Sequence, residues 1–151
     1  MIKIITVGSI KEKYLKDAIE EYTKRISKYS NIEIVEVKDE GTVEPVKAIE
    51  LEAEKIKKYI NPRDYIITLE IEGKQITSEE FSTKIENIFQ ETSNITFIIG
   101  GSYGLSNQIK TMSNFKLSFS KMTFPHQLFR VILLEQIYRA FKISHNESYH
   151  K

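Results

Sequence analysis

The chain contains no cysteine among its 151 residues. That absence excludes disulfide frameworks, thiolate metal sites and cysteine nucleophiles. A chain without disulfides suits a reducing compartment, so we expect it to lie in the cytoplasm. Its three histidines, His126, His145 and His150, lack the tight spacing typical of metal ligands, and we therefore expect no metal site.

Long apolar runs are also scarce. The longest candidate lies within residues 124–143, where it is interrupted by polar or charged side chains that include His126, Gln127, Arg130, Glu135, Gln136 and Arg139. Such a segment is too polar to span a bilayer. The first eight residues lack the apolar length and cleavage site of a secretory signal, and they are more typical of a buried strand. We therefore expect a soluble protein with no membrane partner.

The chain has almost no excess of charge of either sign, because 22 Lys and Arg residues are balanced by 21 Asp and Glu residues and the formal net charge is only +1. The charge is unevenly distributed, however, since residues 101–151 carry +5 and the first hundred residues carry −4. All three histidines lie in the basic third. This segregation is typical either of a surface that faces nucleic acid or of a solvated helix face, and charge alone favours neither.

Hydrophobic periodicity predicts alternating strands and helices. The strand candidates, rich in β-branched and aromatic residues, are residues 2–8, 32–38, 65–71, 95–100 and 115–119. Apolar residues at three- and four-residue spacing predict helices over about 15–29, 46–60, 78–89 and 105–112, and a last helix from Pro125 to about Lys142. This order predicts one α/β domain, residues 1–151, with a mostly parallel sheet and helices on both faces. Ligands of such sheets bind beyond the carboxyl ends of the strands.

The last predicted helix has almost no polar face. Its apolar residues are Leu128, Phe129, Val131, Ile132, Leu133, Leu134, Ile137, Tyr138 and Phe141. A helix of this kind must be covered on nearly all sides. A core helix that also forms a subunit interface meets this requirement, so we expect a homodimer.

Three glycines, Gly100, Gly101 and Gly104, follow the fourth predicted strand. Because they carry no Cβ, the backbone can turn sharply there and approach a ligand closely. The segment contains neither the Gly-Lys-Ser/Thr of a phosphate loop nor the Gly-x-Gly-x-x-Gly of a dinucleotide site. Taken alone, it would more often be only a tight turn.

Residues 117–130 connect the fifth predicted strand to the last helix. Short polar groups together with Met122 and Phe124 could enclose a purine and a thioether-like chain, while His126 and Arg130 share one helix face. Taken alone, His126 would be a satisfied helix-start residue and Arg130 an ion-pair partner. The terminal residues 145–151 carry two histidines and a tyrosine, and chain ends of this kind are usually disordered.

These three features, in this order, closely resemble the RlmH family, bacterial large-subunit rRNA pseudouridine N3-methyltransferases of the SPOUT superfamily. The likeness is carried by Ile-Ile-Gly-Gly-Ser-Tyr-Gly-Leu, Leu-Ser-Phe-Ser-Lys-Met-Thr-Phe-Pro-His-Gln-Leu-Phe-Arg-Val, Glu-Gln-Ile-Tyr-Arg-Ala-Phe-Lys-Ile and the terminal Tyr-His-Lys. The opening Ile-Thr-Val-Gly-Ser-Ile-Lys-Glu-Lys-Tyr and the central Ile-Thr-Leu-Glu-Ile-Glu-Gly-Lys match as well. The resemblance thus covers essentially the whole chain.

The resemblance implies a SPOUT fold, an α/β knot whose C-terminal part, about residues 65–151, forms a trefoil knot and binds S-adenosylmethionine. It implies a homodimer through the last helix, and as substrate a pseudouridine of 23S rRNA in the ribosome. The implied cofactor-binding residues are Leu69, Gly101, Ser120, Lys121, Met122, Thr123, Phe124 and Pro125. Family members vary in side chain at several of these loop positions, so most contacts there are expected through the backbone.

A mechanism follows from this substrate. Methyl transfer from a sulfonium is an in-line displacement, so the protein must align donor and acceptor and help N3 to lose its proton. We hypothesise that His126 or His150 receives the proton, that Arg130 stabilises the anion or a neighbouring phosphate, and that Tyr149 stacks on the base or bonds to it. The small net charge favours docking onto an assembled ribosome over binding of free RNA.

Two other functions remain as alternatives. One is a ribosome-associated binding protein that keeps the fold without catalysis. The other is a small dinucleotide-dependent enzyme with an open α/β sheet. The second is disfavoured because the chain lacks a glycine fingerprint after its first strand and an acidic ribose partner after its second.

Overall fold

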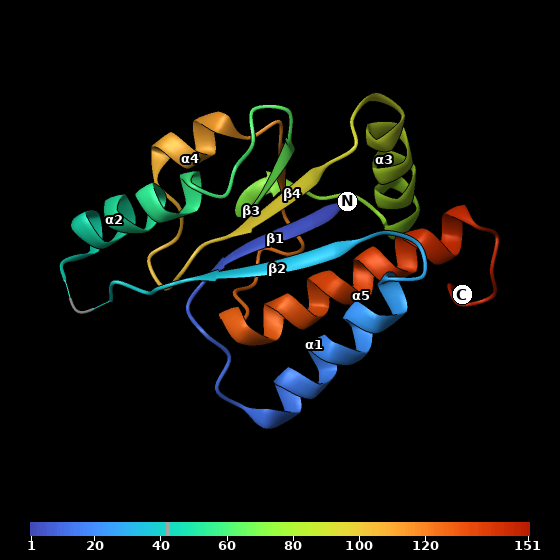
Figure 1. Ribbon diagram of the computed structural model, residues 1–151, viewed down its shortest axis with the longest axis horizontal. Helices are drawn as coiled ribbons and strands as arrows, with labels where there is room; N and C mark the ends of the chain where they lie inside the picture. The colour runs from blue at the N-terminus through green and yellow to red at the C-terminus, as the bar shows by residue number, and fades with distance from the viewer. Residues whose placement is uncertain (42) are drawn as a thin grey trace.

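A computed structural model describes residues 1–41 and 43–151 of the chain. Its centre is a five-stranded sheet in the order β2-β1-β4-β3-β5, in which every pairing is parallel (Figure 1). The strands are β1 (Ile2–Val7), β2 (Ile32–Val37), β3 (Tyr65–Lys74), β4 (Ile95–Ile99) and β5 (Phe115–Leu117). The helices are α1 (Lys13–Ile26), α2 (Pro45–Lys57), α3 (Ser78–Glu91), α4 (Asn107–Met112) and α5 (His126–Ser144).

Helices cover both faces of this sheet. In Figure 1, α2 and α4 lie above it, while α1 and α5 lie below it. The lower face holds the larger apolar cluster, to which α3 also contributes through Phe81 and Ile85. The upper face holds a smaller cluster around Ile5, Ile98 and Ile109. The predicted α/β class, the parallel sheet and the placement of helices on both faces are therefore confirmed.

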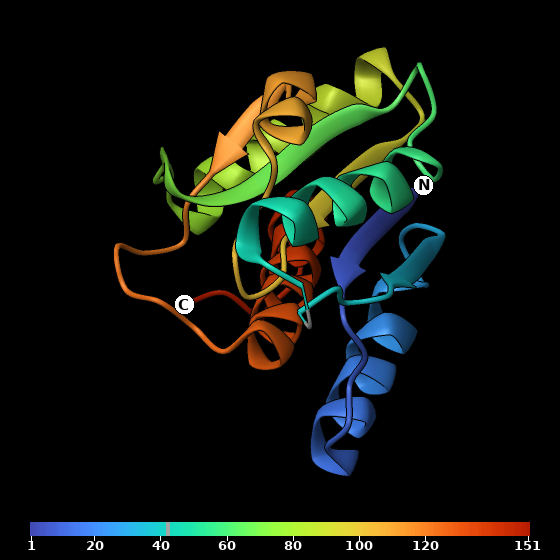
Figure 2. The ribbon, with the colours of Figure 1, turned by 90° about the vertical axis from the view of Figure 1, so that its left-hand side faces the viewer.

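Strand β3 and helix α5 extend three and two residues beyond their predicted ends, whereas α1 and α2 end about three residues early and β5 ends two residues early. Strand β3 continues to Lys74, where Gly73 passes close to β5: a Cβ there would lie 2.8 Å from the backbone of Lys116 and Leu117. Helix α5 begins one residue later than expected, because Pro125 is its N-cap, and it continues to Ser144. The segment between β5 and α5 runs in orange along the left of Figure 2. The trefoil knot stays a prediction.

The C-terminal residues pack onto the rest of the chain, although chain ends of this composition are usually disordered. The Tyr149 hydroxyl donates a 2.5 Å hydrogen bond to Glu135 of α5, and the Tyr149 ring packs edge-on against Tyr138 at 4.9 Å. His150 bonds through Nε2 to Glu79 of α3 at 2.7 Å. These contacts cover the outer side of the C-terminal half of α5.

The N-terminal half of α5 keeps an uncovered apolar strip. Leu128 is 41% exposed, and Val131 and Ile132 are only partly buried; none of the three belongs to either core cluster. Within the part of the chain that the structure describes, no helix is both long enough and apolar enough to cross a bilayer.

Candidate active site

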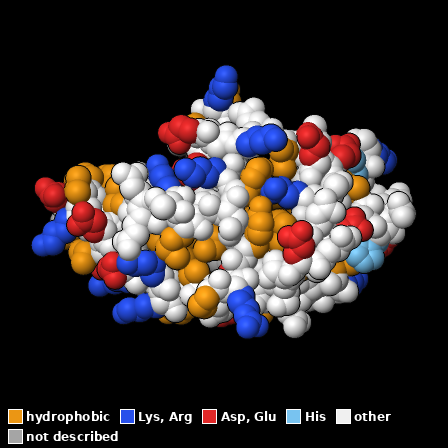
Figure 3. Space-filling model, turned by 90° about the horizontal axis from the view of Figure 1, so that it is seen from above, with side chains coloured by type: hydrophobic (Ala, Val, Ile, Leu, Met, Phe, Trp, Pro, Cys, Tyr) orange, Lys and Arg blue, Asp and Glu red, His pale blue; other side chains and the backbone are white. Residues whose placement is uncertain are grey.

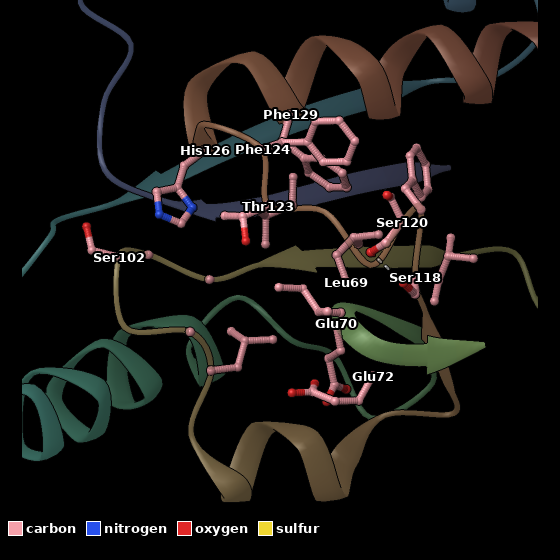
Figure 4. Close-up of a pocket in the computed structure, with 18 of the residues that line it drawn as sticks. Leu69, Glu70, Glu72, Ser102, Ser118, Ser120, Thr123, Phe124, His126 and Phe129 are labelled. Atoms are coloured by element: carbon pink, nitrogen blue, oxygen red, sulfur yellow. Dashed lines mark hydrogen bonds between the residues drawn. The ribbon is translucent and has the colours of Figure 1, made fainter. Parts of the chain in front are cut away.

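A hollow of about 450 Å³ opens at the carboxyl ends of β3, β4 and β5. Its size lies within the usual range of small-molecule sites. Figure 4 shows Leu69 and Glu70 entering it from β3, Ser118 and Ser120 from the segment after β5, and Phe124 and Phe129 from the opposite wall. We refer to this space as the first hollow.

The three glycines form one wall of the first hollow as a tight turn. Gly104 N donates to Gly101 O at 3.0 Å, which closes the turn, and Gly104 has a φ of +84° that favours glycine. At Gly100, a Cβ would lie 2.8 Å from the backbone of Gly104. At Gly101, it would lie 2.9 Å from Val7 Cγ1. The closest collision, with backbone at Gly100, means that a side chain there would force the turn to open.

A second hollow of about 1000 Å³ adjoins the first. Its walls are the segment after β1, from Gly8 to Leu15, the end of β2 and the start of α5. Gly101, Ser102 and His126 line both hollows. The imidazole of His126 therefore lies at the boundary between two adjoining spaces, one of which has apolar walls for a small molecule.

Arg130 lies at the floor of the second hollow with a side chain only 2% exposed. Its guanidinium donates to Glu36 at 2.6 Å and to the carbonyl oxygens of Val7 and Gly8 at 3.1 and 2.8 Å. Burial lowers the pKa of Arg130, and the bond to Glu36 opposes that effect. These bonds tie α5 to β1 and β2. The predicted contact of Arg130 with the anion or with a neighbouring phosphate stays a prediction.

The structure brings most of the predicted residues together. Leu69, Gly101, Ser120, Met122, Thr123 and Phe124 line the first hollow. Pro125 lines the second hollow only, and Lys121 lines neither. Of the residues assigned to catalysis, His126 lines both hollows, whereas Tyr149 and His150 line neither within their own chain.

Comparisons with known proteins agree with this geometry. A family model described as "Predicted SPOUT methyltransferase" matches residues 1–150. The chain belongs to this family. The SPOUT chain is 59% identical to "Putative ribosomal RNA large subunit methyltransferase H" of Methanococcus maripaludis and 55% identical to "Ribosomal RNA large subunit methyltransferase H" of Clostridium botulinum. Each match covers 99% of both chains, so the resemblance to the RlmH family is confirmed.

A solved structure shows the same fold at low identity. It is described as a probable methylase family protein from Haemophilus influenzae, and the match has a TM-score of 0.57 and 14% identity. The match covers 99% of this chain and 70% of the other. This likeness supports the SPOUT architecture of the sheet and its helices.

Sequence reasoning about this SPOUT chain missed several polar groups of the first hollow. Glu70, whose side chain is 7% exposed, lies 3.9 Å from Lys110 of α4. Both line the hollow, together with Glu72. Glu70 directly follows Leu69, so the sequence was sufficient to place it in the predicted strand. The contact with Lys110 was not, because α4 is 40 residues away in the chain.

Glu52 is a second buried acid that the sequence did not indicate. It lies on α2 behind the glycine turn, is 3% exposed, and accepts a hydrogen bond from Glu40 N at 3.0 Å. Its Oε1 would lie 3.5 Å from a Cβ at Gly101. Burial raises the pKa of Glu52, an effect that the Glu40 N–H opposes and nearby Asp39 reinforces.

This raised pKa gives the SPOUT chain a specific pH dependence. In the folded state Glu52 retains its proton at pH values where the unfolded chain has lost it, so the free energy of unfolding falls as pH rises through that interval. We expect Glu52→Gln to remove this fall, because the neutral amide still accepts from Glu40 N. Urea unfolding of both proteins at pH 4.5, 6 and 7.5 would show a difference that grows with pH. A constant difference would contradict this prediction.

Proposed function

We propose that this SPOUT chain transfers a methyl group from S-adenosylmethionine to N3 of a pseudouridine in 23S rRNA. The observation that carries the proposal is the boundary position of His126 between a small-molecule hollow and a second, larger one. The names of the two relatives support an rRNA substrate. We further propose that the chain acts as one domain in the cytoplasm, on the assembled ribosome.

The first hollow suits S-adenosylmethionine in shape and chemistry. Leu69, Phe124 and Phe129 offer apolar walls for adenine, and the hydroxyls of Ser118 and Ser120 offer polar contacts. The glycine turn lets backbone approach the ligand where a Cβ would collide. Bound there, S-adenosylmethionine would supply an activated methyl group, and the protein would supply alignment.

His126 is the residue best placed to receive the acceptor's proton. It lines the space where the two substrates would meet, and it belongs to the first turn of α5, which holds it on a rigid element. Arg130 acts indirectly in this proposal, by holding the segment after β1 against α5. Exclusion of water by the apolar walls would strengthen the polar contacts around the developing anion.

Tyr149 and His150 are proposed to act in the site of a second copy. In its own chain, His150 is held by Glu79 through Nε2 and by Arg139 through Nδ1, at 2.7 and 3.1 Å. The uncovered strip of Leu128, Val131 and Ile132 offers a contact for a second α5. A two-fold axis perpendicular to α5 would pair antiparallel helices, so that each tail would lie near the other chain's His126.

The surface charge supports docking onto a ribosome rather than capture of free RNA. Figure 3 shows Lys and Arg side chains interspersed with Asp and Glu across the face that carries α2 and α4, with no field of a single sign. Tight binding of free RNA usually requires many phosphate contacts. An assembled ribosome can add shape and protein contacts.

Labelled methyl transfer from S-adenosylmethionine tests the proposal. Purified protein would be offered assembled ribosomes, free 23S rRNA and ribosomes that lack the pseudouridine, and we expect label only on the first. His126→Ala should lower kcat by about 100-fold or more, the usual loss for a general base. His145→Ala is the matched control, since that residue follows the C-terminal end of α5, where its ring packs edge-on against Tyr29. Cofactor binding without label on any substrate would favour the non-catalytic alternative.

A further inference from the structure

An exposed aromatic side chain lies at the edge of the second hollow. Tyr14 lies in the first turn of α1, lines this hollow and is 69% exposed. Among the described residues, its ring has no aromatic or cation–π partner. A large aromatic face that is left open beside a hollow is typical of surfaces on which nucleic-acid bases stack.

Positive charge flanks this ring. Lys11 and Lys38 line the hollow from the segment after β1 and from the end of β2. In the part of the chain that the structure describes, neither ammonium group belongs to an ion pair. The acids on the same lining are Glu12, Asp39 and Glu36, and the last is engaged by Arg130. The ammonium groups of Lys11 and Lys38 could therefore contact phosphates that flank a base stacked on Tyr14.

The floor of the hollow contains an unused donor. Arg130 directs its terminal nitrogens to Glu36 and to two carbonyl oxygens, but its buried Nε has no hydrogen-bond partner among the described residues. Buried donors without partners are uncommon in folded proteins, and many are satisfied by a ligand or by water. The donor belongs to a side chain that is 98% buried and lines the same hollow.

We propose that the second hollow binds the acceptor nucleotide of single-stranded RNA, with a base stacked on Tyr14 and flanking phosphates held by Lys11 and Lys38. This inference rests on the proposed function, because it needs an acceptor beside the cofactor hollow. A base extruded from its helix would enter between the segment after β1 and the start of α5. Its reactive edge would then face His126 and the first hollow across Gly101 and Ser102.

Tyr14→Ala is the variant that tests this site. We expect it to raise KM for ribosomes by about ten- to a hundredfold, the usual loss when a stacked aromatic is removed, while the Kd for S-adenosylmethionine changes less than twofold. Tyr14→Phe should stay within threefold of the wild type, because it keeps the ring. Tyr59→Ala is the matched control, since Tyr59 is 44% exposed and lines neither hollow.

Two further measurements separate the site from the proposed reaction. Binding of a fluorescent, uridine-rich single-stranded RNA oligonucleotide should weaken at least tenfold in Tyr14→Ala, whether or not methyl transfer occurs. The Lys11→Ala, Lys38→Ala double variant should reduce the slope of log Kd against log salt by about 1.4, from two lost phosphate contacts. Unchanged oligonucleotide binding by Tyr14→Ala would contradict the proposed RNA site. If that variant instead dissociated a dimer, Tyr14 would belong to a subunit interface, which would also contradict the site. Normal oligonucleotide binding without turnover would overturn only the proposed reaction.

Discussion

Replacement of Arg130 by methionine is expected to lower the free energy of unfolding by about 3 kcal/mol. The methionine fills much of the same volume, but it leaves the carbonyl oxygens of Val7 and Gly8 without their donor. Glu36 would also lose its charged partner, although its own 42% exposure lets water compensate for part of that loss. Urea unfolding monitored by circular dichroism would measure the change.

Two further variants test whether the loss of stability comes from the buried bonds of Arg130. Arg25→Met removes an ion pair with Glu21 whose side chains are 40% and 50% exposed, and it should cost less than about 1 kcal/mol. Combining Arg130→Met with Glu36→Gln should cost less than the sum of the two single changes, because they share one interaction. Strict additivity would show that the pair with Glu36 contributes no coupling energy. A loss at Arg130 no larger than the loss at Arg25 would show that the buried guanidinium does not stabilise the fold.

Replacement of Gly100 by alanine should abolish methyl transfer and weaken binding of S-adenosylmethionine by more than about tenfold. The added Cβ would lie 2.8 Å from the carbonyl carbon and oxygen of Gly104 and 3.1 Å from Leu105 Cγ. Backbone cannot move aside as a flexible side chain can, so the turn that forms one wall of the first hollow would have to open. Isothermal titration calorimetry would measure the loss of cofactor affinity.

Gly104→Ala separates this collision from conformational strain. A Cβ at Gly104 meets no atom within 4 Å, but its φ of +84° disfavours alanine. We expect a cost of about 1 kcal/mol in stability and only a small change in cofactor affinity. An equal loss of affinity in both variants would mean that the turn responds to strain and not to the collision between Gly100 and Gly104.

The alternation of apolar runs and amphipathic segments was enough to predict the strands and helices to within a few residues. Local pattern suffices there because strands such as Ile95–Ile99 are buried on both faces, and helices such as α1 bury one stripe. The extension of β3 to Lys74 was missed because Glu72, Gly73 and Lys74 do not continue its apolar run. That extension is stabilised by pairing with β5, which is distant in sequence.

The candidate site was partly predictable from the same local information. Gly101, Ser120, Met122, Thr123 and Phe124 were identified through the motifs that resemble the RlmH family, and they line one hollow. The positions and hydrogen bonds of the other predicted site residues depended on segments that are distant in the sequence. Arg130 bonds to groups 94 to 123 residues away, and His150 contacts Glu79, 71 residues away.

By itself, then, the sequence determined the α/β class, the parallel sheet and the family, since hydrophobic periodicity and motif order are properties of neighbouring residues. Tertiary structure alone decided that Arg130 is a buried clamp, that Tyr149 packs on α5 and that His126 lies between two hollows. The physical reason is that burial and hydrogen-bond partners depend on distant segments meeting. The segments that surround a side chain therefore determine whether it can contact a substrate or only stabilise the fold.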